Sequence, residues 1–445
     1  MRRRSAVLIV ALVTTGWKLA IAATTYGTND VTHWKNFARV VRRLGPVKIY
    51  STRLVPPFNH PPLASYMLVA INAITAHHLS SAGFLIRVPA SVADIATAVL
   101  VFELLGRLGR SLNEATAAGV VVALSPVLLI VSGFHGNTDP VFVMFMLLSA
   151  FLLLQNRPAL AGASAALACS TKLVPIVALP ALAAYVWRDR RQLTRTASGF
   201  LVVFLVLWLP AITQQWDGLK RNVLDYTGWD GNNPHWGPVD AAHRANLPSL
   251  VTFLPGSGRF LILAVSAAIP AALVLRRRST LAMGIGLSLA FFLLLTPAFA
   301  MQYLAWAAAV VLLLDLWWGT AYNLAAGALL FIVYDRWSSG FPWNHAHAGG
   351  MLTSEANIGW IVWTILLTCI VLGIFRMWRW PADETDTCER ARDGEERSSG
   401  HRPTPVAPQI PSAASGRAVG SSITNPLSLA YSLEARGASR RAPTL

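Results

Sequence analysis

The sequence predicts an all-α fold, a polytopic transmembrane helical bundle of about 12 spans. Three observations predict it. Of the 445 residues, 54% are hydrophobic and only 13% are charged, whereas about 25% are charged in an average soluble domain. Apolar runs of nearly spanning length recur along residues 1–380. Arginines gather in the short segments between alternate runs, as they do in cytoplasmic loops.

The apolar runs define the expected spans, because about 20 apolar residues cross the hydrocarbon core as a helix. Ser5–Ala23 is the first run, and the basic residues 2–4 precede it. The run is long for a signal peptide and lacks a convincing cleavage site. We therefore expect a first span with a cytoplasmic amino terminus. The other runs are 84–105, 115–133, 139–154, 158–171, 173–187, 197–212, 259–275, 280–296, 300–316, 319–334 and 357–375.

A further apolar stretch, Leu63–Leu79, decides the predicted topology. It is short and contains Asn72, His77 and His78. If it does not span, nearly all arginine groups fall on the side of the amino terminus, and if it does span, most of them move to the other side. The positive-inside rule therefore predicts an interfacial or re-entrant helix on the outer face.

This topology divides the chain into two parts. Residues 1–380 form a transmembrane domain with three long outer loops, at 24–83, 213–248 and 335–357. Residues 381–445 are rich in Pro, Ser, Gly, Ala and Arg without apolar periodicity, so we expect a disordered cytoplasmic tail. Arginines and acids balance in that tail. The net charge of +16 therefore belongs to the loops of the first part, where it reports topology and does not indicate a nucleic-acid partner.

The first outer loop concentrates polar side chains. Asp30 is its only carboxylate; such a group beside apolar surface can act as a general base, but the pattern alone favours a solvated loop acid. His33, Phe37 and Val40 recur at helical spacing, which indicates an amphipathic helix on the membrane. Prolines remove backbone donors, so residues 56–62 should form an extended strap.

Four charged residues stand in or beside the expected spans. Asp139, followed by Pro140, fits either a helix N-cap or a ligand-facing acid. Arg87 and Lys172 lie near the outer boundary, where they can bind a lipid phosphate or extend towards lipid headgroups. Asp94 is the one acid well inside a span. It is functional by default, or it pairs with Arg87 two turns earlier.

Signals for a metal or a cofactor are weak. The pair His345 and His347 has no matching set of ligands, and three cysteines are too few for a cysteine-rich site. The sequence therefore predicts no cofactor and no metal site, although a divalent metal ion is compatible with it.

In their order along the chain, these motifs resemble a family. It is the GT-C superfamily of integral-membrane glycosyltransferases, and within it the hexosyltransferases that use polyprenyl-phosphate sugars. An ungapped match on His33-Trp34 sets Gly27 where the family has its acid, so Asp30 takes that role in a loop three residues shorter. The motifs that carry the resemblance are Asp30, His33-Trp34, Asn59-His60-Pro61-Pro62-Leu63, Arg87-Val88-Pro89 with Asp94, Gly136-Asn137-Thr138-Asp139, Thr171-Lys172 and Gln302-Tyr303.

The resemblance implies an inverting transfer of mannose or glucose from a polyprenyl-phosphate sugar to a lipid-linked or cell-envelope glycan. It implies an active site on the outer face of a membrane, and the Arg- and Ala-rich composition favours a bacterial plasma membrane. Asp30 would be the base, and Arg87 and Lys172 would bind the donor phosphate. The implied substrate-binding residues are His33, Trp34, Asn59, His60, Asp139, Gln302 and Tyr303.

Three alternatives stay open. A transporter or flippase for a lipid-linked saccharide would place ionisable groups at mid-membrane and often show inverted repeats, whereas here the polar residues crowd the outer loops. An inactive scaffold of the same fold is the second alternative. The third is an arabinofuranosyl- or protein glycosyltransferase of the same superfamily.

Overall fold

The computed structural model describes residues 2–228 and 235–380. Within them the chain is almost entirely helical, and its one sheet is a parallel pair of two-residue strands, β1 (Gly27–Thr28) and β2 (His345–Ala346). The prediction of an all-α polytopic bundle is confirmed. The predicted tail, residues 381–445, lies outside the described residues.

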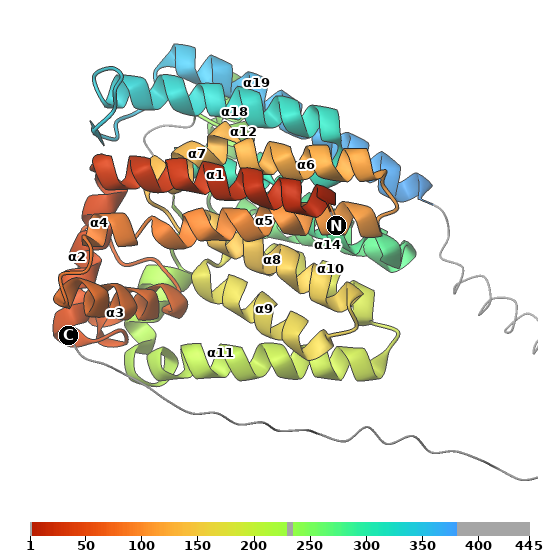
Figure 1. Ribbon diagram of the computed structural model, residues 1–445, viewed down its shortest axis with the longest axis horizontal. Coiled ribbons are helices and arrows are strands. Elements are labelled where there is room, and N and C mark those ends of the chain that lie inside the picture. The colour runs from red at the N-terminus through yellow and green to blue at the C-terminus, as the bar shows by residue number, and fades with distance from the viewer. Residues whose placement is uncertain (1, 229–234, 381–445) are drawn as a thin grey trace, which may run out of the picture. The chain divides into compact units, whose positions relative to one another are not determined.

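Eight helical segments in this described part of the chain are long and apolar enough to cross a membrane. Most of them run along one common direction (Figure 1). They are α1 (Arg2–Thr24), α4 (Ala82–Leu85) with α5 (Val88–Arg107), α6 (Leu112–Leu124) with α7 (Pro126–Ile130) and the π-helical turn η2 (Val131–His135), α11 (Arg190–Leu219) with η4 (Lys220–Leu224), α14 (Gly258–Arg276), η5 (Arg278–Thr280) with α15 (Leu281–Leu295), α18 (Leu316–Trp337) and α19 (Thr353–Arg379).

The other predicted runs form shorter helices. They are α8 (Asp139–Leu154), α9 (Pro158–Thr171), η3 (Val174–Ala178) with α10 (Leu179–Val186), and η6 (Met301–Leu304) with α16 (Ala305–Ala308) and α17 (Val311–Leu314). Every predicted run is therefore helical, and eight of them have the length of a span. The predicted loop at 213–248 starts later than expected, because α11 continues to Leu219; α12 (Gly237–Arg244) and α13 (Pro248–Phe253) then precede α14.

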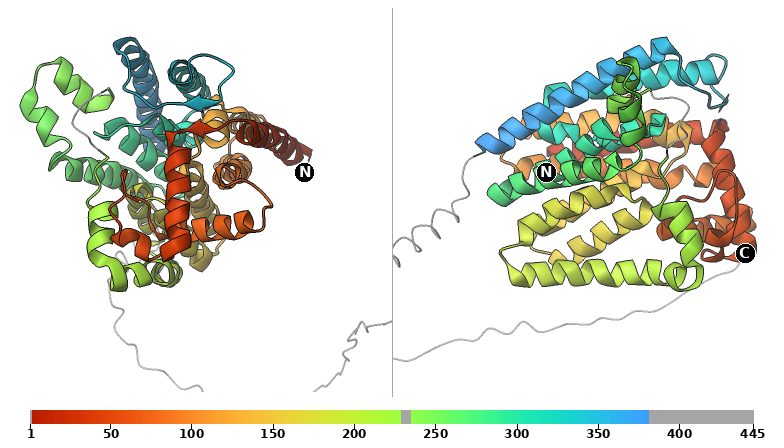
Figure 2. Two further views of the ribbon diagram at one scale, coloured as in Figure 1. Left: turned by 90° about the vertical axis from the view of Figure 1, so that its left-hand side faces the viewer. Right: turned by 180° about the vertical axis from the view of Figure 1, so that it is seen from behind.

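One end of the bundle carries the elements of the first predicted loop. There α1 ends, and α2 (Asn29–Leu44), η1 (Lys48–Ser51), α3 (Pro62–Ala76) and α4 follow (Figures 1 and 2); we call it the α2 end. The predicted amphipathic helix is α2, which buries Trp34 and Phe37. The strap before α3 is not helical, as the prolines predict, and the stretch expected at Leu63–Leu79 is helical only to Ala76.

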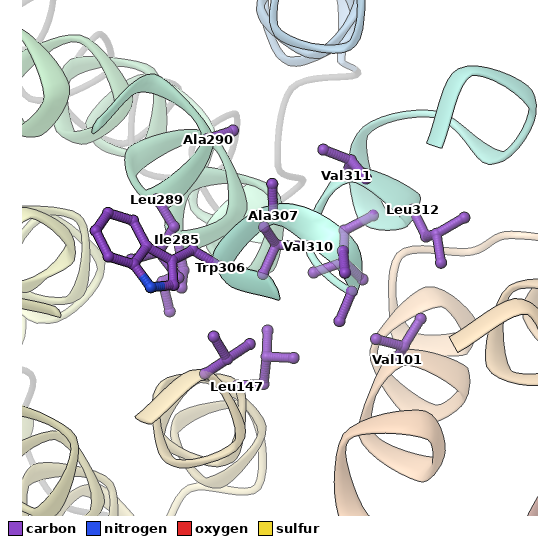
Figure 3. Packing of buried hydrophobic residues seen from close by; sticks show 14 of the residues in the cluster. Val101, Leu147, Ile285, Leu289, Ala290, Trp306, Ala307, Val310, Val311 and Leu312 are labelled. Atoms are coloured by element: carbon purple, nitrogen blue, oxygen red, sulfur yellow. The ribbon is translucent and has the colours of Figure 1, made fainter. Parts of the chain in front are cut away.

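The core is centred on the segment Met301–Leu314, most of which is buried. A helix that is apolar on all sides must be surrounded by other helices. Figure 3 shows this packing: the segment meets α15, α8 and α5. The labelled residues are Trp306, Ala307, Val310, Val311 and Leu312 of the segment, with Ile285, Leu289, Ala290, Leu147 and Val101 around them.

The turn η2 positions the polar residues near the α2 end. All five of its residues are buried. A Cβ on Gly133 would lie 3.1 Å from the Lys18 Cα atom, so α1 passes directly against this turn. Such π-helical turns are frequent at functional sites.

Candidate active site

A cavity of about 650 Å³ opens among the loops at the α2 end. We call it the catalytic cavity, after the candidate catalytic acid Asp30 on its wall. One part of its wall is polar and the rest is apolar and aromatic. The polar part contains Asp30, His33, Asn59, His60, Asn137, Lys172 and Gln302, and the apolar part contains Leu173, Val174, Ile176, Val223, Phe260, Leu263, Phe292 and Trp306. This division suits an amphiphilic ligand.

Asp30 reaches the cavity because of the way α2 begins. Thr28 is the N-cap, and its side-chain oxygen accepts a hydrogen bond from the Asp30 backbone N–H at 3.2 Å. Just before it, Gly27 has φ +92°, and a Cβ there would lie 2.7 Å from the Phe134 carbonyl oxygen. The glycine thus lets the chain turn closely past η2, which places the first turn of α2 beside His135.

The Asp30 carboxylate is hydrogen-bonded to His135, which is in turn hydrogen-bonded to Tyr334 in the core. His135 Nε2 lies 2.8 Å from Asp30 Oδ2, and His135 Nδ1 lies 2.5 Å from the Tyr334 hydroxyl oxygen. Asn137 Nδ2 also donates to Oδ2, at 3.4 Å. The His135 side chain is 6% exposed, whereas that of Asp30 is 34% exposed. One carboxylate oxygen is therefore anchored while the group stays open to the cavity.

The charge state of this site follows from its neighbours. Burial raises the pKa of Asp30, but His135 above all, and then His33 and His60, outweigh burial and hold that pKa below its usual value. Burial lowers the pKa of His60 to about 3, and Lys172 adds to this effect. At neutral pH the site thus offers an ionised Asp30 beside a neutral His60, whose ring is stacked on Trp34 at 4.3 Å between centroids.

Lys172 is a cation on the polar wall. Its Nζ lies 2.5 Å from Asp139 Oδ1, and it stands 4.6 Å from the ring centroid of Tyr303 and 5.1 Å from that of Trp306. Asp139 is fully buried in the first turn of α8, where Thr138 is the N-cap but makes no capping hydrogen bond through its side chain. Asp139 therefore serves to hold Lys172.

Arg87 is placed differently from the expectation. It is buried, at 1% exposure, and does not line the catalytic cavity. Its guanidinium donates to the Thr25 carbonyl at 2.8 Å and to the Gly133 carbonyl at 3.2 Å. Arg87 thus joins the end of α1 to η2 and holds the turn that carries His135.

The predicted pairing of Asp94 with Arg87 is wrong. Asp94 Oδ2 lies 2.6 Å from Lys18 Nζ and accepts a hydrogen bond from Ser132 Oγ, also at 2.6 Å. The pairing was inferred from the seven-residue spacing of Arg87 and Asp94 alone. In the structure, α1 brings Lys18 to the same acid. Neither Asp94 nor Lys18 lines the catalytic cavity.

Residues 59–216 match the family described as dolichyl-phosphate-mannose-protein mannosyltransferase. The match confirms the resemblance to the GT-C superfamily. It indicates a glycosyltransferase. The apolar helices of the chain indicate an integral membrane protein. No curated protein matches the chain.

Most of the predicted site residues line the catalytic cavity. Arg87 does not, and Asp139 contributes through Lys172. The lining residues are Asp30, His33, Trp34, Asn59, His60, Lys172, Gln302 and Tyr303. The family match covers the strap from Asn59 onwards and Lys172, but neither Asp30 nor Gln302.

Sequence reasoning missed two residues of the site. His135 stands directly before the Gly136-Asn137 motif, and that adjacency is the signal that could have indicated it. Tyr334 lies in an apolar run, where nothing distinguishes it from a core aromatic residue. Among residues 2–228 and 235–380, no three His, Cys, Asp or Glu side chains are grouped to hold a metal ion.

Proposed function

We propose that the protein is an inverting hexosyltransferase that moves mannose or glucose from a polyprenyl-phosphate sugar to a hydroxyl of a lipid-linked or cell-envelope glycan. One observation carries the proposal: a carboxylate, Asp30, and an ammonium group, Lys172, line the polar part of one cavity whose other part is apolar and aromatic. A sugar phosphate with a long hydrocarbon chain has the matching chemistry.

In the proposed reaction Asp30 is the general base. The acceptor oxygen attacks the anomeric carbon from the face opposite the phosphate, and Asp30 takes the acceptor's hydroxyl proton. The bond between the anomeric carbon and the phosphate oxygen breaks, and polyprenyl phosphate leaves with the electron pair. Because the neighbouring histidines keep its pKa low, Asp30 is ionised and ready to accept the proton at neutral pH. His135 and Tyr334 orient it.

Lys172 is the proposed binder of the leaving phosphate. The phosphate gains charge as the bond breaks, and a fixed cation at the edge of a low-dielectric region stabilises that charge strongly. An ammonium group has three protons to donate, and Asp139 takes one of them, so two are left for phosphate oxygens. Arg259 lines the cavity. It is the proposed second cation for the donor phosphate, the role that the sequence analysis gave to Arg87.

The proposed orientation puts the α2 end on the outer side of a bacterial plasma membrane. The start of α1, with its arginines, lies at the opposite end (Figure 1). The positive-inside rule assigns that opposite end to the cytoplasm.

The test follows release of polyprenyl phosphate by the purified chain in detergent, with polyprenyl-phosphate mannose and polyprenyl-phosphate glucose as donors and water as the acceptor of the sugar. We expect wild type to consume one donor, whereas a transporter has no compartments to act between and consumes neither. Asp30→Asn should lose nearly all of this release. Asp225→Asn is the control, because Asp225 is an exposed acid paired with Lys220. Wild type without donor consumption overturns the proposal, and an active Asp30→Asn variant removes Asp30 as base.

A further inference from the structure

A second hollow, of about 260 Å³, lies between α2 and the strap; we call it the basic groove. The α2 side contributes Asn36, Arg39 and Arg43, and the other side is formed by Leu54, Val55 and Pro56, where the strap begins. The α2 residues stand three or four apart, so they share one face of the helix. The groove is thus a built concavity between two elements at the α2 end.

The charge of this groove is positive and uncompensated. No carboxylate lines it, and the sequence has no acid between Asp30 and Asp94. The Arg39 and Arg43 side chains are exposed, and Arg39 Nη1 donates to Asn36 Oδ1 at 2.6 Å, which steadies the guanidinium. Guanidinium groups bind phosphate oxygens through paired hydrogen bonds, so the groove suits a phosphate group.

The basic groove and the catalytic cavity share a wall. His33, Phe37 and Pro56 line both. Asp30 precedes His33 by three residues, about one turn of α2. A ligand bound in the groove can therefore extend past His33 to the base.

We propose that the basic groove binds a phosphate group of the sugar acceptor while its hydroxyl meets Asp30. This inference rests on the proposed function and adds the class of the acceptor. At about 1.5 Å of rise per helical residue, Arg39 and Arg43 stand about 14 and 20 Å from Asp30 along α2. The acceptor must span that distance, so it is an oligosaccharide that carries a phosphate and not a monosaccharide phosphate.

A binding experiment tests the groove without relying on turnover. The probe is a fluorescent hexasaccharide with a phosphate at its reducing end, and the neutral hexasaccharide is its reference. The full chain is placed in phosphatidylcholine nanodiscs as wild type, Arg39→Gln/Arg43→Gln and Arg42→Gln. Arg42 is the control, because it is exposed on the same helix but does not line the groove.

We expect wild type to bind the phosphorylated probe more tightly than the neutral one. The double variant should raise the Kd of the phosphorylated probe about five- to tenfold, as expected for two exposed ion pairs, and added salt should reduce this difference. Arg42→Gln should bind the phosphorylated probe with the wild-type Kd. The Kd of the neutral probe should be the same in all variants. Equal binding of both probes by wild type, or an unaffected double variant, overturns the proposal.

Two further measurements distinguish an acceptor site from a lipid-headgroup site and from a failure of the proposed function. If the arginines bind bilayer headgroups, the double variant lowers affinity for phosphatidylglycerol vesicles but not for the probe, which contradicts an acceptor site. Release of polyprenyl phosphate to water needs Asp30 and not the groove, so wild type should release it when no acceptor is present. If wild type releases no polyprenyl phosphate, the proposed function is contradicted. If wild type releases it but the double variant binds the phosphorylated probe as tightly as wild type, only the proposal for the groove is contradicted.

Discussion

Asp30 and Asp94 are both held by the short turn η2, yet their surroundings differ. Ser132 of the turn donates to Asp94, and His135, three residues later, is hydrogen-bonded to Asp30. Asp94 faces Lys18 in the interior, and both side chains are at most 2% exposed. Asp30 faces a histidine and is 34% exposed beside a cavity.

The difference shows that a charged residue within a bundle is not a functional site by itself. Lys18 balances the charge of Asp94, and the pair joins α1 to α5. Neither residue lines the catalytic cavity. Asp30 is paired with a histidine and, among the described residues, with no lysine or arginine. It also lines the cavity, so a ligand can use its carboxylate. Access to a cavity, not depth in the bundle, separates the structural acid from the candidate catalytic one.

The largest expected effect contrasts the two acids in turnover. Asp30→Asn should lower kcat about 10²- to 10⁴-fold, the usual contribution of a general base. The double variant Lys18→Met/Asp94→Leu should keep most of the wild-type kcat, since its pair does not reach the cavity. The measurement is release of polyprenyl phosphate. Equal losses in both variants would remove the contrast between the two acids.

The next effect contrasts them in stability. Lys18→Met alone leaves Asp94 buried without its partner, which should cost about 3–5 kcal/mol of unfolding free energy. The double variant with Asp94→Leu should regain most of this loss, because no buried charge is left. Thermal unfolding in detergent, followed by size-exclusion chromatography, measures both. A single variant as stable as wild type contradicts the structural role of the pair.

A smaller effect concerns the partner of Asp30. His135→Gln should lower kcat/KM about 10- to 100-fold, the equivalent of one hydrogen bond to a charged group. Because His135 lowers the pKa of Asp30, the acid limb of the pH profile should move to higher pH in the variant. Tyr334→Phe should shift it less. An unchanged acid limb would reduce His135 to a packing residue.

The smallest effect concerns His60 and acid stability. Its pKa is about 3 in the folded chain, against 6.5 for a free histidine, because of burial. The unfolded chain therefore gains a proton that the folded chain does not, and stability falls as the pH falls from 6.5 towards 3. Wild type should lose a few degrees more Tm than His60→Gln between pH 7 and pH 5. Identical losses contradict the burial of a neutral imidazole.

The fold and much of the candidate site could be predicted from local features. Apolar runs predicted where helices form, and prolines predicted the extended strap before α3. The helical spacing of His33 and Phe37 predicted α2. The partners of charged residues could not be predicted, because spacing along one helix allowed an Asp94–Arg87 pair, while a different helix supplies Lys18.

Sequence alone determined the helical class, the apolar runs and the residue types that could do chemistry, because hydropathy and backbone restrictions act over a few neighbouring residues. Only the tertiary structure decided which groups meet. The passage of α1 and α2 against η2 gives Asp94 a lysine, gives Asp30 a histidine, and turns Arg87 away from the cavity. These outcomes depend on how helices distant in sequence cross, and no local pattern encodes that geometry.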